Sequence, residues 1–320
     1  MRTAEARRAM LLHLAVIALL FAAQFVLPAY HHTNFARIMV LACYAIGYNL
    51  LVGYTGLLSL GHAMFFAAGL YGAGLTMQYL GFGALSGFAA GLFAGLGLAA
   101  AVGLLALRTS GVSFMIVTLM FAQVFYLTTL YFNNFTRGDE GFVLDAAARR
   151  GSIGGVSFDL SDPATRYNLA LILFAVCVLL SLALVRSAVG RVLIAVRENE
   201  DRTIMLGYHS FRYKLLALAI SGAMAGAAGA AYALLFSYVG ATFASIQYSI
   251  FPLLWVLLGG AGTIIGPLLG TLLMFYMVDF ASEYTSSYML AVGVALVLLV
   301  LWFPKGILGT LRERGVPWLP

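Results

Sequence analysis

The 320-residue chain is 62% hydrophobic and 9% charged, and its mean hydropathy is +0.97. Because soluble domains carry about 25% charged residues, this composition excludes a soluble protein and indicates an integral membrane protein. The formal net charge is +6, but the basic residues lie between apolar runs instead of on one soluble face. We therefore expect no nucleic-acid partner.

Apolar runs long enough to cross a hydrocarbon layer about 30 Å thick recur along the whole chain. We expect an all-α, polytopic membrane protein with a single transmembrane domain over residues 1–320. About ten membrane-spanning helices are predicted, at positions 10–29, 36–58, 62–80, 84–107, 112–132, 167–186, 214–238, 246–260, 263–282 and 286–303. The first run follows arginines, as a secretory signal does, but its length favours an uncleaved span.

The positions of the basic residues predict how the chain is oriented in the membrane. With the amino terminus in the cytoplasm, 13 of the 18 Lys and Arg residues fall in cytoplasmic segments, as the positive-inside rule requires. This orientation predicts a multi-pass protein of the cell's inner (plasma) membrane with both termini in the cytoplasm. The connection 133–166 then lies outside and the segment 187–214 inside. Both termini lie on the same side of the membrane only if region 239–285 crosses it twice or not at all.

Glycines interrupt two apolar regions in opposite halves of the chain: NLLVGYTGLLSLGHAMF at 49–65 and LLGGAGTIIGPLLGT at 257–271. Paired interruptions of this kind indicate discontinuous helices around a central transport site, because broken backbone at membrane depth must face protein or water. Close helix packing through small residues is the alternative. The residues predicted to line a route for a polar solute are Asn49, Gly53, Thr55, Gly56, Ser59, Gly61, Gly259, Gly260 and Gly262.

Other ionisable residues in the apolar regions favour structural roles. We expect His62 to lie near the cytoplasmic membrane surface, solvated and without partners for a metal site. Asp279 and Glu283 are spaced four residues apart and form an interfacial pair on one helix face, ahead of a proton-coupling site. Cys43 and Cys177 both lie in apolar runs and are interpreted as small buried hydrophobes, so no metal centre is predicted.

The cytoplasmic segment 187–214 is predicted to form two short helices. Apolar residues recur at helical spacing in the first. Asn199 can cap the second, which Gly207 would end. Exposed Ile204 and Met205 between these boundaries suit insertion into a groove on a cytosolic partner. An amphipathic helix lying on lipid headgroups is the alternative.

Four segments, in this order, resemble the branched-chain amino-acid ABC-transporter permease family, and specifically the M-type member of its paired permeases. They are NLLVGYTGLLSLGHAMFFAAGLYGAG, RENEDRTIMLGYHSFRYKLLALAISGAMAGAAGAAYA, GGAGTIIGPLLGTLL and FPKGILG. The similarity extends from the second span to Gly309.

The resemblance implies a coupling site for an ATPase. ABC permeases carry Glu-Ala-Ala, three residues and Gly in the coupling loop; here Asp201 and Gly207 match, whereas Arg202 and Thr203 replace the alanines. The residues expected to couple to the ATPase are Arg197, Glu198, Asp201, Ile204, Met205 and Gly207. The family's outer Thr-Gly-Gly-x-x-Gly turn resembles TRGDEG at 136–141, with Arg137 in place of a glycine.

The resemblance also implies the partners: a second, H-type permease, two cytosolic ATPase subunits and an extracytoplasmic solute-binding protein, all beside membrane lipid. Family solutes include branched-chain amino acids, urea and short amides. The sequence has no G-x-x-x-x-G-K-[ST] phosphate loop, so we expect no enzyme and no cofactor bound by this chain, with ATP used by the partner subunits. A self-sufficient secondary transporter or channel is the alternative; a membrane enzyme lacks its usual motifs.

Overall fold

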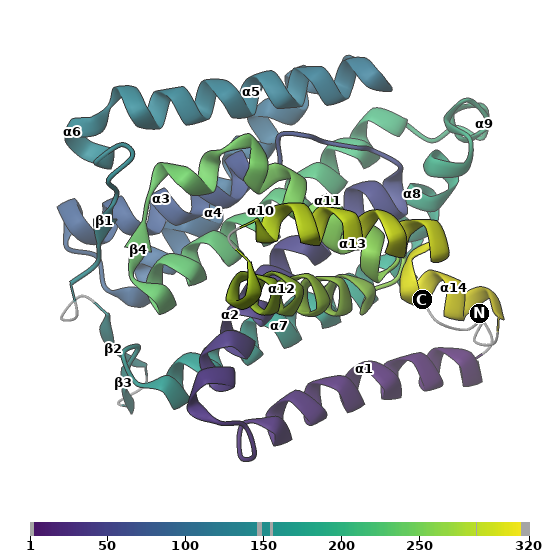
Figure 1. Ribbon diagram of the computed structural model, residues 1–320. Coiled ribbons are helices and arrows are strands. Elements are labelled where there is room, and N and C mark those ends of the chain that lie inside the picture. Colours follow the sequence, from purple (N-terminus) through teal and green to yellow (C-terminus); the bar gives the residue numbers. More distant parts are fainter. Residues whose placement is uncertain (1–2, 146–148, 154–155, 286, 315–320) are drawn as a thin grey trace.

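A computed structural model describes residues 3–145, 149–153, 156–285 and 287–314. The chain folds into a bundle of helices whose two ends carry different elements (Figure 1). The helices are α1 (Thr3–Ala23), α2 (Ala29–Asn49), α3 (Ala63–Leu80), α4 (Ala84–Ala106), α5 (Val112–Tyr131), α6 (Asn133–Thr136), α7 (Pro163–Arg186), α8 (Ala188–Glu198), α9 (Glu200–Met205), α10 (Ser210–Phe236), α11 (Ile246–Gly259), α12 (Gly266–Tyr284), α13 (Tyr288–Trp302) and α14 (Gly306–Arg314). A π-helical turn, η1 (Leu50–Thr55), extends α2, and a 3₁₀ turn, η2 (Ala241–Ala244), precedes α11.

The helical fold class is confirmed. Within the described residues, five helices are long and apolar enough to cross a membrane: α2 with η1, α4, α5, α7 and α10. The helix α11 is apolar but has only 14 residues, which is shorter than the 17 to 25 residues of a full span. The total of ten spans therefore stays a prediction.

Helices α3, α4 and α10 pack at very short distances because glycines face one another between them. A Cβ on Gly95 of α4 would lie 2.6 Å from the Cα of Gly226 on α10, and one on Gly69 of α3 would overlap the backbone of the same Gly226. Small residues that let helix backbones approach are typical of membrane helix interfaces. These glycines fix the centre of the bundle.

The stretches that follow α2 and α10 occupy matching places in the two halves of the fold. Helix α2 is followed by a non-helical stretch, 56–62, and then by α3 and α4, while α10 is followed by 237–245 and then by α11 and α12. Helix α10 packs on α3 and α4, and α2 packs on α11 and α12. The backbone N–H of Ala63, at the start of α3, donates to Ser249 Oγ in the first turn of α11 (3.0 Å). The first turns of α3 and α11 thus meet inside the bundle.

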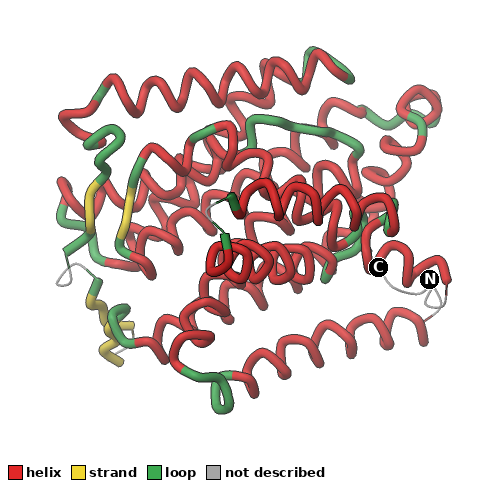
Figure 2. The backbone as a smooth tube through the Cα atoms, viewed as in Figure 1, coloured by secondary structure: helices red, strands yellow, loops and turns green. Residues whose placement is uncertain are grey.

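Short strands lie at the bundle end opposite α8, α9 and α14 (Figure 2). Strand β1 (Phe142–Val143) pairs antiparallel with β4 (Tyr238–Val239), and β2 (Arg150–Ile153) pairs with β3 (Val156–Asp159). The first pair joins the 133–166 connection to the stretch after α10. Arg137, at the position where the resemblance expects glycine, adopts a left-handed conformation with φ 58°.

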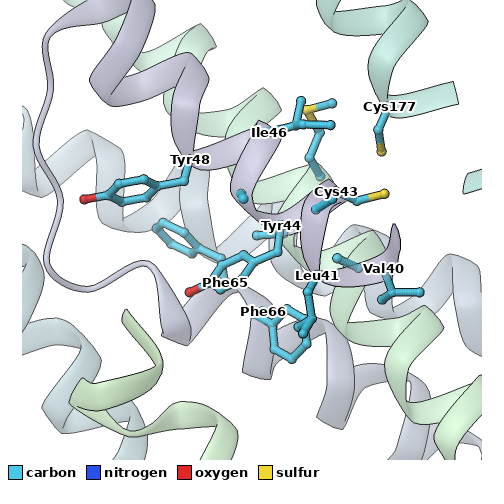
Figure 3. Close-up of a cluster of buried hydrophobic side chains, with 14 of the residues drawn as sticks. Val40, Leu41, Cys43, Tyr44, Ile46, Tyr48, Phe65, Phe66 and Cys177 are labelled. Carbon is cyan, nitrogen blue, oxygen red and sulfur yellow. The ribbon is translucent and has the colours of Figure 1, made fainter. Parts of the chain in front are cut away.

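The core surrounds α2, which is buried along most of its length. Figure 3 shows Tyr44 and Tyr48 of α2 with Phe65 and Phe66 of α3 in this core, where the ring centroids of Tyr44 and Phe66 lie 4.9 Å apart. Cys43 and Cys177 point toward each other in this view and are buried free thiols. Their predicted role as small buried side chains is confirmed.

Candidate functional site

Arg197 connects α8 to the broken end of α2. Its Nη1 donates a hydrogen bond to the backbone carbonyl of Gly53 in η1. The same nitrogen lies close to Gly262, where an added Cβ would come within 3.4 Å of it. One side chain of the segment 187–214 therefore reaches both glycine-interrupted regions.

Asn49 joins the two interrupted regions directly. Its Nδ2 donates to Thr263 O (2.9 Å), and its Oδ1 accepts from the N–H of Gly262 (2.9 Å). The side chain is 1% exposed, so these bonds form away from solvent, where an unmade bond is costly. The residue predicted to line a route acts in this structure as a clamp between the two loops.

The glycines beside this clamp are required by close contact or by backbone conformation. A Cβ on Gly53 would overlap Asn49 Oδ1 and lie 2.5 Å from the N–H of Gly262. Gly260 and Gly262 have φ of 120° and 76°, values that favour glycine. Gly259 lies against the backbone of Gly266. Packing, the alternative weighed from the sequence, accounts for each of these glycines in this conformation.

The helix of the predicted span 36–58 ends at Thr55. Gly56 has φ 75°, and the N–H of Leu57 donates to Leu51 O (2.9 Å). Thr55 donates to Leu50 O (2.8 Å), and the N–H of Gly61 donates to Ser59 Oγ (3.3 Å). The predicted break is therefore present, with its hydroxyls buried and hydrogen-bonded inside the chain.

The expectation that His62 is solvated is wrong. The chain turns back into the bundle after Gly56, which leaves His62 0% exposed between the rings of Tyr44 and Tyr48. Its Nε2 lies 3.2 Å from Ser221 Oγ, whose hydroxyl donates to Gly47 O (2.5 Å). Because the single hydroxyl proton of Ser221 is used on that carbonyl, Nε2 of His62 carries the proton of this contact.

The segment 187–214 folds as predicted into two short helices, α8 and α9. The side chain of Asn199 accepts from the N–H of Arg202 (2.9 Å) and caps α9. Gly207 ends it with φ 89°, and its N–H donates to Ile204 O (2.9 Å). Both boundary predictions are confirmed.

The tip of α9 is an exposed apolar surface, formed by Ile204, Met205 and Leu206, which are 49%, 85% and 75% exposed. Glu198 and Asp201, two of the predicted coupling residues, are also exposed. An apolar tip of this kind, surrounded by charges, suits a groove on a partner protein.

Lys214 ties α9 to α10. Its Nζ lies 2.5 Å from Glu200 Oε2. Partial burial on its own would raise the pKa of Glu200, but hydrogen bonds from Lys214 and Ser210 hold that pKa below its ordinary value. This ion pair is therefore retained at neutral pH, and it fixes α9 against the start of α10.

Two cavities lie away from the clamp. A groove of about 870 Å³ between α4, α7 and α10 has almost entirely apolar walls, and a cleft of about 370 Å³ lies between α2, α11 and α12. Asp279 lines the cleft, and its two carboxylate oxygens, each 2.8 Å from the hydroxyl of Tyr30, share the single proton of that hydroxyl. None of the nine residues predicted to line a route borders either cavity. The described part of the chain holds no cluster of metal-ligating side chains.

Comparison with known proteins identifies the family. The family described as "Branched-chain amino acid transport system / permease component" matches residues 33–302. The chain belongs to this permease family. It is 32% identical to the high-affinity branched-chain amino acid transport system permease protein LivM of Escherichia coli K12, over 86% of this chain and 69% of the relative.

Two further relatives carry related descriptions. The LivM protein of Salmonella typhimurium is 31% identical over the same shares of the two chains. The probable LivM protein of Methanocaldococcus jannaschii is 29% identical over 39% of this chain and 41% of its own. No solved structure matches the chain significantly.

The permease fold uses several residues at the clamp that sequence reasoning missed. Arg312 of α14 donates to Gly262 O (3.2 Å), and Tyr48 donates to Ser59 O (2.8 Å). Thr263 and Ser249 accept bonds from the opposite half of the chain. The motif FPKGILG, which leads into α14, was a usable signal: its first glycine, Gly306, has φ 73° and lies against Gly260.

Proposed function

We propose that this chain is the membrane-embedded permease subunit of an ATP-driven importer for a small polar solute. The names of its relatives favour branched-chain amino acids. Small amides and urea, which the family resemblance implies, are the next class. The observation that carries the proposal is the bond from Arg197 to Gly53 O. It links a segment suited to an ATPase with the interrupted helices of the membrane domain.

The proposed complex contains a second, H-type permease, two cytosolic ATPase subunits and an extracytoplasmic solute-binding protein. The apolar tip of α9 supports an ATPase contact, because three neighbouring apolar side chains are exposed there among charges. ATP binds to the partner subunits and no cofactor binds to this chain. The β1–β4 end, which includes the 133–166 connection, contacts the solute-binding protein.

In this structure the route is closed at the nine residues predicted to line it. Because Asn49, Thr55 and Ser59 are buried and hydrogen-bonded, solute passes only after the two interrupted regions separate. Movement of α8 with the ATPase would pull on Gly53 through Arg197. A cysteine at Thr55 should therefore be inert toward a small polar thiol reagent in the resting complex and reactive in one transport state. Inertness in resting and ATP-trapped complexes alike would place the route elsewhere.

The proposed orientation puts α8, α9, α14 and both termini in the cytoplasm and the β1–β4 end outside. Single cysteines at Ser161 and Ser210, in a background without Cys43 and Cys177, test it. An impermeant thiol reagent added to intact cells from the outer side should label the first and not the second. Labelling of both positions contradicts this orientation.

Reconstitution tests the function itself. Liposomes containing this chain with its H-type partner and ATPase subunits should accumulate leucine when ATP and a leucine-loaded binding protein are supplied. Omission of the ATPase should abolish uptake. Uptake by this chain alone, driven by an ion gradient, would support the secondary-transporter alternative instead.

A further inference from the structure

We infer that Arg37 and Arg166 form a binding site for a carboxylate at the β1–β4 end of the bundle. This inference rests on the proposed function, because it supplies the entry site for an amino-acid solute. The two guanidinium groups share one aromatic ring: their Cζ atoms lie 5.0 Å and 5.8 Å from the ring centroid of Phe236, the last residue of α10.

These arginines come from different helices and are not held by acids. Arg37 lies on α2 and Arg166 in the first turns of α7, and they are close enough to interact electrostatically. In the described part of the chain neither forms a salt bridge. The Nε atoms of both are buried and have no hydrogen-bond acceptor. Two like charges placed together without an ion-pair partner repel each other, so an anion between them would relieve the repulsion.

The acid that interacts with Arg166 electrostatically is Asp162, and its carboxylate has another task. It caps α7 by accepting from the N–H and the hydroxyl of Thr165 (2.9 and 2.8 Å). These bonds lower the pKa of Asp162, so its charge persists, but it is held at the helix start. Arg166 itself makes one long bond, of 3.4 Å, to Ser161 O. Most of its donors remain available.

Arg37 and Arg166 are also not needed as hydrogen-bond donors to the last backbone carbonyls of α10. Arg149 fulfils that role, donating to Leu234 O (2.8 Å), Leu235 O (3.1 Å) and Leu160 O (3.0 Å). Arg37 and Arg166 donate to none of these carbonyls. Their contact with Phe236 uses no N–H donor in a conventional hydrogen bond, so the guanidinium groups can still bind a planar anion such as a carboxylate.

The surroundings suit an amino acid with an apolar side chain. Asn34, one turn before Arg37, is 8% exposed, and its Nδ2 has no acceptor. From Phe236 a series of ring contacts runs inward through Tyr232, Phe66 and Tyr44 to His62 at the break before α3, with centroid distances of 4.8, 6.0, 4.9 and 5.5 Å. The site thus lies at the outer end of an aromatic column that reaches the interrupted region.

Arginine-selective modification of the full chain in nanodiscs tests the site. Phenylglyoxal adducts at Arg37 and Arg166 are quantified by mass spectrometry, with exposed Arg137 as the internal control. In phosphatidylcholine discs, leucine and isovalerate should both suppress modification of the pair, and leucinol, which lacks the carboxylate, should not. Modification of Arg137 should be unchanged by all three.

The other outcomes are equally decisive. Suppression that appears only in phosphatidylglycerol discs, whatever leucine is added, would assign the pair to a lipid phosphate and overturn the inference. No suppression by any anion would also overturn it. Suppression by isovalerate without leucine would retain the carboxylate site while contradicting the amino-acid solute of the proposed function.

Two variants separate ligand binding from a structural role. Arg149→Gln loses three hydrogen bonds and should lower the melting temperature of the purified chain, whereas Arg37→Gln loses none and should not. In the assembled importer, Arg37→Gln should raise the KM for leucine by about 10- to 100-fold, the equivalent of a lost charged hydrogen bond. A melting temperature lowered as far as in Arg149→Gln, or an unchanged KM, would contradict the inference.

Discussion

The side-chain oxygen of Asn49, Oδ1, accepts a hydrogen bond of 2.9 Å from the backbone N–H of Gly262, a residue 213 positions later in the chain. The two glycine-interrupted regions are thus one structural unit. Gly53 lies where the two regions touch, so its missing side chain is a requirement of the clamp and not a sign of general flexibility.

Gly53→Ala should disrupt this clamp. The new Cβ would overlap Asn49 Oδ1, and overpacking of this kind costs about 1–3 kcal/mol. We expect a lower melting temperature of the purified chain and loss of uptake. Gly97→Ala in α4 is the matched control, because nothing lies within 4 Å of a Cβ there, and it should be neutral. Equal stability of the two variants would show that the clamp is not tight.

Gly207→Ala tests the end of α9 separately from packing. Gly207 and Gly81 both have positive φ, 89° and 66°, and both have open space around an added Cβ. Alanine at either position should therefore cost about 1–2 kcal/mol of backbone strain. Only the Gly207 variant lies beside the proposed ATPase contact, so it alone should reduce solute-stimulated ATP hydrolysis in the complex. An equal reduction in Gly81→Ala would attribute the effect to lost stability.

Ile204→Glu tests whether the apolar tip of α9 binds a partner or lipid. Ile204 is 49% exposed, so the change should alter the stability of the isolated chain by less than about 0.5 kcal/mol. We expect it to abolish co-purification of the ATPase subunits. Leu311→Glu on α14 is the control, since Leu311 is 54% exposed at the same bundle end. Normal ATPase binding by Ile204→Glu would favour the lipid-surface alternative for α9.

The features that could be predicted from the sequence are those set by local chemistry. Asn199 and Gly207 bound α9 through capping and a left-handed stop, both of which are specified by nearby residues. Gly56 likewise marks the end of the helical turn η1. Long apolar runs were sufficient for the helical fold class.

The features that could not be predicted depend on contacts between distant segments. The burial of His62 follows from the direction in which the chain turns after Gly56, which glycine permits but does not determine. The pairing of β1 with β4 joins residues almost one hundred positions apart, and two-residue strands carry no alternation pattern to detect. The partners of Asn49 and Arg197 are backbone atoms, so no side-chain pattern reveals them.

Arg197→Gln in the assembled importer is the most direct test of the account. The central claim is that Arg197 transmits movement of the coupling segment to Gly53, and the measurement is leucine transported per ATP hydrolysed. Arg191→Gln is the control, because Arg191 is an exposed arginine on the same helix whose side chain makes no hydrogen bond to the described residues. We predict that Arg197→Gln retains assembly and basal ATP hydrolysis but loses most transport per ATP, while Arg191→Gln keeps the wild-type ratio. A wild-type ratio in Arg197→Gln would contradict the account.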